Sequence, residues 1–455
     1  MRIDPWSSQQ STDYARLRDE FGIEEFNYAQ RLEAATGQPA SRLIRRGVIF
    51  GHRGFEPVMR AIEDDQPWGV LTGLMPSGPM HLGHKMVMDQ VMYYQSLGAD
   101  VTICVADIEA YATRGMSLEK AREIAMEEYI STYFALGLKP ERLQVYFQSD
   151  RQAVKDMAWQ LAPKVNWSAM ESIYGFGGDT NMGKVISPLV QVGDILHVQL
   201  PKYGGPRPIV VPVGVDQDPH VRLTRDIAQG FRLFNVQWHK DQKLGDVLGI
   251  FVKGVEDPKV AEKHLKAAEK YLTKILGFGD FVMNAAYGAL YIPAARPKDV
   301  VSVDVALAKL EPKLGDHFGF IAPASTYHRF MQGLTGGKMS SSKPETHISL
   351  RDDAKSAAKK VAGALTGGRT TAEEQRRLGA ETDKCMVYEL YVYHLIEDDA
   401  ELTDTYTKSS TGAMLCGECK NGIAKPRIEA LINKINDGRP AGRALAEKVV
   451  EASRQ

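Results

Sequence analysis

The chain has 455 residues, of which 44% are hydrophobic and 25% charged, and its formal net charge is -1. This length allows two or three domains with a sizeable core, and the near-zero charge excludes attraction of nucleic acid by the molecule as a whole. No apolar run approaches the length of a membrane span, the N-terminus lacks a signal-peptide pattern, and the four cysteines do not suggest a disulfide framework. We therefore expect a cytoplasmic globular protein.

Residues 1–66 predict a polar, helical N-terminal extension. Residues 13–21 and 26–36 are its candidate helices, and a short basic run extends from Arg42 to Arg46. A basic run of this length is usually a solvated helix face, so we expect no chemistry in this segment.

The stretch from Thr72 to His84 predicts a strand, a glycine-rich turn and then a helix. Such a turn offers backbone N–H groups and a helix N-terminus to an anion, and its glycines allow the backbone to approach closely. His81 and His84 stand three apart at the helix entry, so both can face one ligand. The pattern favours a nucleotide phosphate, with a metal pair or two plain surface histidines as alternatives.

An alternation of apolar runs and helical patterns follows. Residues 101–106 and 143–147 predict two more strands, and the long helix between them can be capped by Ser117 and ended by Gly137. Strand, helix, strand, helix, strand is half of a doubly wound parallel sheet. Ligands bind in such sheets at the carboxyl ends of the strands, where Glu109 follows the second predicted strand.

A further buried strand is predicted at residues 209–215. It leads to a polar cluster from Asp216 to His220, again at a carboxyl end. Such a cluster is more often part of a site than of a core, because buried polar groups need partners.

Residues 257–277 predict a separate helix, capped by Asp257 and ended by Gly277. Its lysines fall on one face at helical spacing: Lys259, Lys263, Lys266, Lys270 and Lys274. We interpret this face as solvated, and contact with RNA is the less favoured alternative.

A glycine-, lysine- and serine-rich loop extends from Gly336 to Pro344. Lys338 offers a point charge and the serines offer hydroxyl donors, which suits a polyphosphate, although such loops are often solvated connectors. It is not a Walker A loop, because Met339 follows Lys338 where serine or threonine is required. The chain beyond it predicts helices, and we assign no metal to its Cys416 and Cys419 pair, which lacks two clear further ligands.

Together the two glycine-rich stretches resemble the HIGH and KMSKS signatures of class I aminoacyl-tRNA synthetases. Residues 173–176, 215–226, 367–369 and 411–415 look like the tryptophanyl-tRNA synthetases of the archaeal and eukaryotic type. The resemblance implies an α/β fold with a Rossmann-type doubly wound parallel sheet. It implies a catalytic domain at residues 67–350, with an insertion at about 239–317, and a helical anticodon-binding domain at residues 351–455.

The resemblance also implies a tryptophan--tRNA ligase. In that reaction the tryptophan carboxylate attacks the α-phosphate of ATP, pyrophosphate leaves, and tryptophan passes from the adenylate to the 3' end of tRNA(Trp). The family works as a homodimer with Mg²⁺, and no membrane is involved.

The site residues implied by the resemblance form two sets. His81, His84 and Lys338 are the catalytic residues, and the ATP-binding set is Thr72, Gly73, Ser77, His81, Gly83, His84, Lys338, Met339, Ser340, Ser341 and Ser342. The tryptophan-binding set is Leu71, Cys104, Glu109, Gln191 and Gln217. Leu71 and Cys104 depart from the eukaryotic pattern, which has tyrosine and glutamine there for the indole N–H.

Three alternatives remain. One is a tyrosine--tRNA ligase of the same class. The second is a small-molecule nucleotidyltransferase that shares the HxGH stretch, against which the long helical region after the lysine loop argues. The third is a catalytically silent tRNA-binding paralogue, against which the intact His81, His84 and Lys338 argue.

Overall fold

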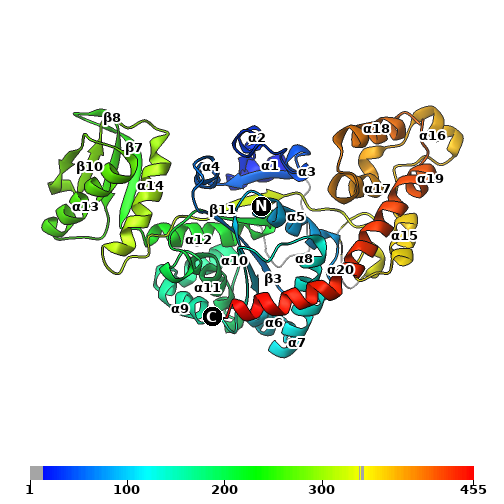
Figure 1. Cartoon of the computed structure of the whole chain (residues 1–455), viewed down its shortest axis with the longest axis horizontal. Coiled ribbons are helices and arrows are strands. Elements are labelled where there is room, and N and C mark those ends of the chain that lie inside the picture. The colour runs from blue at the N-terminus through cyan, green and yellow to red at the C-terminus, as the bar shows by residue number, and fades with distance from the viewer. Residues whose placement is uncertain (1–13, 338, 340–342, 455) are drawn as a thin grey trace.

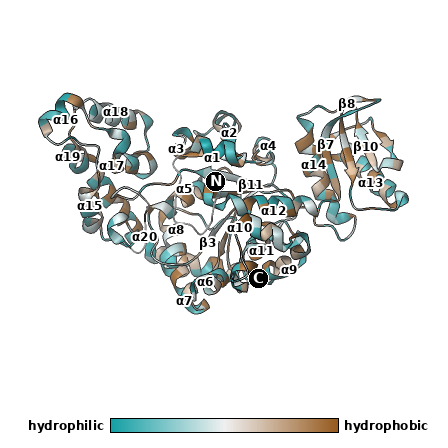
Figure 2. Ribbon diagram, turned by 180° about the vertical axis from the view of Figure 1, so that it is seen from behind, coloured by the Kyte–Doolittle hydropathy of each residue, from teal (hydrophilic) through white to brown (hydrophobic). Residues whose placement is uncertain are grey.

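The computed structural model describes residues 14–337, 339 and 343–454. Figure 1 shows a central α/β body, a smaller α/β lobe on one side and a helical region on the other. In Figure 2, apolar residues are prominent on β10 in the smaller lobe, whereas α18 in the helical region is largely polar. Among the described residues, no helix combines the length and the apolar character that crossing a bilayer requires.

The central body is built on a seven-stranded sheet with the order β1-β2-β11-β6-β3-β4-β5. Its strands are β1 Glu24–Glu25, β2 Ile49–Arg53, β3 Gly69–Leu74, β4 Asp100–Val105, β5 Leu143–Phe147, β6 Ile209–Gly214 and β11 Ala324–His328. The strands from β11 to β5 are parallel, whereas β2 and β1 extend the sheet with antiparallel pairing. If the five parallel strands are numbered by their order in the chain, their spatial order from β5 to β11 is 3-2-1-4-5. This order confirms the predicted Rossmann-type fold.

The strands β3 and β6 meet at the point where the strand order reverses. Their register contains only Gly69↔Ile209 and Val70↔Val210, so the two strands part toward their carboxyl ends. Doubly wound sheets bind ligands at this switch point, and the Thr72–His84 stretch begins there.

Helices cover the central sheet. They are α1 Tyr14–Phe21, α2 Ala29–Thr36, α3 Arg42–Arg45, α4 Glu56–Glu63, α5 Leu82–Ser96, α6 Asp107–Arg114, α7 Leu118–Ile124, α8 Ser131–Leu136, α9 Gln152–Leu161, α10 Trp167–Tyr174, α11 Met182–His197 and α12 Asp218–Gly230. The π-helical segment η1 Ala125–Ile130 and three short 3-10 helices complete them: η2 Ala162–Lys164, η3 Pro201–Tyr203 and η4 Val215–Gln217. The predicted helix from Ser117 to Gly137 is present as α7, η1 and α8, and Ser117 caps it.

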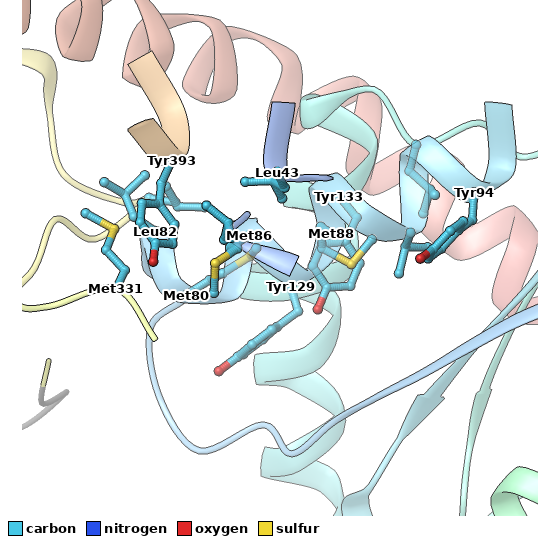
Figure 3. Packing of buried hydrophobic residues seen from close by; sticks show 14 of the residues in the cluster. Leu43, Met80, Leu82, Met86, Met88, Tyr94, Tyr129, Tyr133, Met331 and Tyr393 are labelled. Carbon is cyan, nitrogen blue, oxygen red and sulfur yellow. The ribbon is translucent and has the colours of Figure 1, made fainter. Parts of the chain in front are cut away.

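A core of methionines, leucines and tyrosines anchors α5. Figure 3 shows Tyr129 and Tyr133 beside Met86 and Met88 of this helix, and all four side chains are buried. Because such interiors are close-packed, the core fixes the entry of α5 against its neighbours.

The prediction that residues 1–66 form a helical extension is only partly right, because this part of the chain also supplies β2 to the central sheet. Within the basic run Arg45 is exposed, as predicted, but Arg42 and Arg46 do not lie on a solvated face. The Arg46 side chain is 6% exposed, pairs with Asp399 at 2.8 Å and donates to Val392 O and Ile396 O at 2.7 and 2.8 Å. Arg42 pairs with Asp89 of α5. The sequence pattern could not reveal these partners, because they belong to distant segments.

The smaller lobe has its own sheet and core. Its antiparallel sheet has the order β7-β8-β10-β9, with β7 Phe234–Asp241, β8 Gly245–Val252, β9 Val282–Asn284 and β10 Ala289–Ile292. Its helices are α13 Pro258–Leu276, α14 Asp299–Leu310, η5 Ala285–Tyr287 and η6 Glu311–Lys313. The predicted caps of α13 are confirmed: Asp257 accepts from Lys259 N at 2.9 Å, and Gly277 is left-handed. The five lysines of this helix are exposed.

The C-terminal region is helical throughout the residues described. Its elements are η7 Pro344–Thr346, α15 Ala354–Gly363, α16 Ala372–Leu378, η8 Thr382–Lys384, α17 Met386–Leu390, η9 Tyr391–Leu395, α18 Asp399–Ser410, α19 Cys416–Cys419, η10 Lys420–Ala424 and α20 Lys425–Ala452. The long α20 runs from this region back across the central body, where it packs on α8 (Figure 1).

Glu311 joins the two ends of the smaller lobe by hydrogen bonds. Its side chain has no exposed surface, and it accepts from Arg232 Nε at 2.8 Å, Leu233 N at 3.0 Å and Phe234 N at 3.1 Å. The start and the end of the lobe therefore share one carboxylate.

We predict that Glu311→Ala destabilises the lobe by about 3–5 kcal/mol, because Arg232 then keeps only the partly exposed Asp304 as its carboxylate partner and two buried backbone N–H groups lose their acceptor. Thermal and denaturant unfolding of the full chain measures this loss. The exposed Glu256→Ala variant of the same lobe is the control, and equal stability of the two variants would contradict the prediction.

Candidate functional site

His81 and His84 cap the start of α5 reciprocally. Gly83 N donates to His81 Nδ1 at 3.1 Å, His81 N donates to His84 Nδ1 at 3.2 Å, and the ring centroids are 4.0 Å apart. Because each Nδ1 accepts a backbone proton, a neutral ring carries its own proton on Nε2. Two Nε2–H donors are therefore available at this helix N-terminus.

Burial keeps both rings neutral. It lowers the pKa of His81 to about 2, with further lowering by His84 and His347, and it lowers the pKa of His84 to about 4, helped by His347. Neutral imidazoles can donate hydrogen bonds to a phosphate oxygen without themselves bringing charge. The ring of Tyr129, whose oxygen is hydrogen-bonded to the Ser77 backbone, supports His84 at 5.6 Å.

The chain that leaves the second glycine-rich loop pairs with the first. Leu82 N donates to Ile348 O at 3.3 Å, Leu350 N donates to Met80 O at 2.8 Å, and His81 bridges to Ser349. The ring of His347 lies 5.2 Å from that of His81. The two signatures therefore lie together, although they are far apart in the sequence.

The predicted ATP-binding residues fall into two groups. Thr72 is buried at the end of β3, whereas Gly73 and Ser77 are exposed, and a side chain at position 73 would meet no atom within 4 Å. A Cβ at Gly83 would lie 2.9 Å from the His81 ring and 3.3 Å from Met339 Cε, so only glycine fits there. Lys338, Ser340, Ser341 and Ser342 lie outside the described residues.

Glu109 is positioned by the first turn of α6. Asp107 begins that helix and is fixed by Ser149, whose N–H donates to Asp107 Oδ1 at 3.0 Å. Glu109 N in turn donates to Gln148 Oε1 at 3.4 Å. Burial raises the pKa of Glu109 to about 7, and the nearby charge of Asp194 raises it further, whereas Arg114 opposes the rise.

The structure adds Asp194, which the predicted set of site residues omits. This buried side chain of α11 accepts from Tyr146 Oη at 2.7 Å and from Gln148 Nε2 at 2.6 Å, and burial raises its pKa to about 6. Gln148 therefore joins Asp194 to Glu109. A carboxylate within the apolar run from Leu189 to Leu196 is the sequence signal that could have identified it.

The remaining predicted tryptophan-binding residues line the same edge of the sheet. Leu71 of β3 is buried against Ile195 and Val211, and Cys104 of β4 is buried against Tyr146 and Val190. Burial raises the pKa of the Cys104 thiol, which keeps it protonated. Two amides complete the set: Gln191 lies one turn before Asp194 on α11, and Gln217 follows β6 and donates to Asp216 Oδ2 at 3.3 Å.

Comparison with known proteins identifies relatives along most of the chain. The family model of class I tRNA synthetases (W and Y) matches residues 63–250 and 303–431, and the residues between these two blocks belong to the smaller lobe. The tryptophan--tRNA ligase of Thermoplasma acidophilum is 44% identical over 93% of each chain, and that of Archaeoglobus fulgidus is 42% identical over 93% of this chain and 94% of its own. The crystal structure of tryptophanyl-tRNA synthetase from Aeropyrum pernix superposes with a TM-score of 0.73 at 36% identity, covering 98% of this chain and 99% of that one.

We predict that His84 makes the fold sensitive to acid. Its pKa of about 4 in the folded state lies below the ordinary 6.5, so only the unfolded chain gains this proton between those values. Stability should therefore fall as the pH falls from about 6.5 to about 4, and His84→Asn should reduce the slope of unfolding temperature against pH in that range.

The slope should not vanish in this variant, because other buried histidines also contribute to the pH dependence of stability. The control is His317→Asn in the smaller lobe, which should leave the slope nearly unchanged. A slope that His84→Asn leaves unchanged would contradict a neutral, buried imidazole at this position.

Proposed function

The chain belongs to the class I tRNA synthetases that act on tryptophan and tyrosine, and we propose how the site around His81 performs their reaction. The protein is a tryptophan--tRNA ligase: it joins tryptophan to the α-phosphate of ATP and then passes tryptophan to tRNA. The observation that carries the assignment to this site is the capped histidine pair at the switch point after β3, with the carboxylate pair of Glu109 and Asp194 after the neighbouring strand β4.

Adenylate formation is an in-line displacement in which the tryptophan carboxylate attacks the α-phosphate and pyrophosphate leaves. The protein supplies no covalent nucleophile, so positioning and stabilisation of charge carry the rate. We assign the Nε2–H groups of His81 and His84 to the phosphate oxygens. The pair is preorganised, because both rings are already fixed by their Nδ1 bonds.

The second loop follows the leaving group. Lys338 meets the pyrophosphate as its charge grows, and Ser340, Ser341 and Ser342 offer hydroxyl donors to the same phosphates. The proximity of Met339 to Gly83 supports this placement, because it brings the loop to the start of α5. Thr72, Gly73 and Ser77 line the ATP side of the site.

Tryptophan lies beside the carboxylate pair in our proposal. Glu109 accepts from the α-ammonium group, and Gln191 and Gln217 complete that polar end. Leu71 and Cys104 provide apolar walls for the indole ring. Asp194 takes over the role of acceptor for the indole N–H, since its two oxygens offer about four acceptor positions and already accept from Tyr146, Gln148 and the Cys104 thiol.

Mg²⁺ accompanies ATP in this proposal. In nucleotide sites it is held chiefly by phosphate oxygens and water, with few protein ligands. The chain's chemistry fits that arrangement, since the described residues contain no group of three or more His, Cys, Asp or Glu side chains placed for a metal. When bound, the ion neutralises phosphate charge.

We propose that the helical region after Arg351 binds the anticodon arm of tRNA(Trp) and that the protein works in the cytoplasm.

We also propose a homodimer that uses the outer faces of α9, α10 and α11. Trp159 is 78% exposed, and Trp167, Met182 and Ile186 on these helices are also exposed, so these helices offer apolar surface to a second chain. Light scattering of the Trp159→Glu variant tests whether this face holds two chains together.

Pyrophosphate exchange with each amino acid tests the assignment. Exchange that depends on tryptophan alone is the expected result, whereas exchange with tyrosine would identify the tyrosine enzyme of the same class. Exchange without any tRNA charging would limit the protein to the first step.

We predict that Glu109→Gln raises the KM for tryptophan roughly tenfold or more and leaves the KM for ATP nearly unchanged, because a charged hydrogen-bond partner of the ammonium group is lost. In the unmodified enzyme the KM for tryptophan should rise as the pH falls below about 7, since the carboxylate is then protonated. The Glu109→Gln variant should lose this pH dependence. Equal changes in both KM values would contradict the role.

We predict that Lys338→Ala slows adenylate formation about a hundredfold, or by about 3 kcal/mol, because the lysine acts on charge that develops in the transition state. The KM values should change little, and transfer from preformed adenylate should be less affected. Single-turnover measurement of the two steps tests this, with the exposed Lys263→Ala of α13 as control. A normal rate of adenylate formation would show that the loop is only a connector.

A further inference from the structure

The root of the second signature loop is attached to the C-terminal helical region. Gln332, four residues after β11, donates from its backbone N–H to Glu389 Oε1 of α17 at 2.9 Å. A second path runs parallel to this bond: Leu365 N donates to Leu334 O at 2.7 Å, and Met386 N donates to Leu365 O at 3.1 Å. Both paths end on α17, so this short helix faces the point where the loop begins.

The two ends of the loop are also joined to each other. Leu334 N donates to Thr346 O at 2.8 Å, and Gly333 N donates to Gly337 O at 2.7 Å. A Cβ at Gly333 would lie 2.8 Å from Thr346 O, so the two chain segments are in tight contact. Because the base of the loop is a fixed unit, a shift of Gln332 shifts the point from which Lys338 is presented.

Glu389 is an unusual residue for this position. It is half-buried, and burial raises the pKa of its carboxyl group to about 7, against the opposing effect of the Gln332 bond. The charge of Glu389 acts on Tyr14 of α1 and on Tyr393 of η9, and Arg329 after β11 acts on the same two tyrosines. Removing a carboxylate from water costs free energy, and an apolar side chain could pack there without that cost. An apolar side chain could not, however, accept the hydrogen bond that Gln332 N donates to Glu389.

We propose that Glu389 is a positioning residue for adenylate formation, which holds the loop root at Gln332 so that Lys338 is delivered to the phosphates. The inference rests on the proposed function of Lys338 and extends it, because it places control of the catalytic loop in the helical region. A change in that region, such as engagement of tRNA, can then reach the loop through one hydrogen bond and its parallel backbone path.

Three substitutions in the full-length enzyme separate the effect of side-chain length at position 389 from the effect of its charge. Glu389→Gln keeps the length and an acceptor oxygen, Glu389→Asp keeps the charge but is shorter by one methylene, and Glu389→Ala keeps neither. We expect Glu389→Ala and Glu389→Asp to slow single-turnover adenylate formation roughly tenfold, and Glu389→Gln to slow it less than about threefold. The KM values for tryptophan and ATP should stay unchanged. Glu373→Ala, an exposed residue of the same region, is the control.

The double variant Lys338→Ala with Glu389→Ala tests whether Glu389 acts through the loop. We expect it to be no slower than Lys338→Ala alone, because the two residues serve one interaction. Two outcomes would overturn the role of Glu389 and leave the role of the loop intact. They are fully additive losses in the double variant, and a normal rate for Glu389→Ala when Lys338→Ala is slow. A normal rate for Lys338→Ala would overturn the role of the loop and this inference with it. If Glu389→Ala does not fold, the Asp and Gln variants decide, and equal rates for them overturn the proposal.

Discussion

The pairing of residues 80–82 with residues 348–350 is the constraint on which the site depends. Two backbone hydrogen bonds hold the first turn of α5 against the chain that leaves the second loop. That turn is already shaped by the reciprocal caps of His81 and His84. With one end of the loop fixed here and the other at Leu334, the two signatures are held together by main-chain bonds, which do not depend on the identity of loop side chains.

Burial moves the polar groups of the site toward their neutral forms. It lowers the pKa of both histidines and raises the pKa of Glu109 and Asp194. A site with little fixed charge can accept an ammonium group and a polyphosphate side by side. Oriented N–H groups then stabilise the charge that develops during reaction, and they need no reorganisation at that moment. The burial of the two histidines also makes the fold acid-sensitive, because the unfolded chain binds protons that the buried rings do not.

The two outer parts of the molecule are joined to the central body in different ways. The smaller lobe has a separate core, and the buried Glu311 ties its two ends together. The C-terminal region instead shares the main core, receives the Arg46 side chain from the N-terminal segment and returns to the body through α20. A displacement of the C-terminal region is therefore opposed by packing around α5, whereas the lobe can shift with little effect on that core. This asymmetry agrees with our proposal that the C-terminal region binds tRNA and positions the second loop.

Local patterns determined much of this protein. The period and caps of α13, the run that became β4 and the turn at Thr72–His84 each depend on neighbours within a few residues, so the sequence predicted them and the structure confirmed them. The two signatures and their family could also be recognised, because they are short and contiguous. The sequence could not reveal that Arg46 is buried, that β2 joins the sheet or that Asp194 lies beside Glu109. Each of these depends on a partner from a distant segment, and only the tertiary structure decides which distant segments meet.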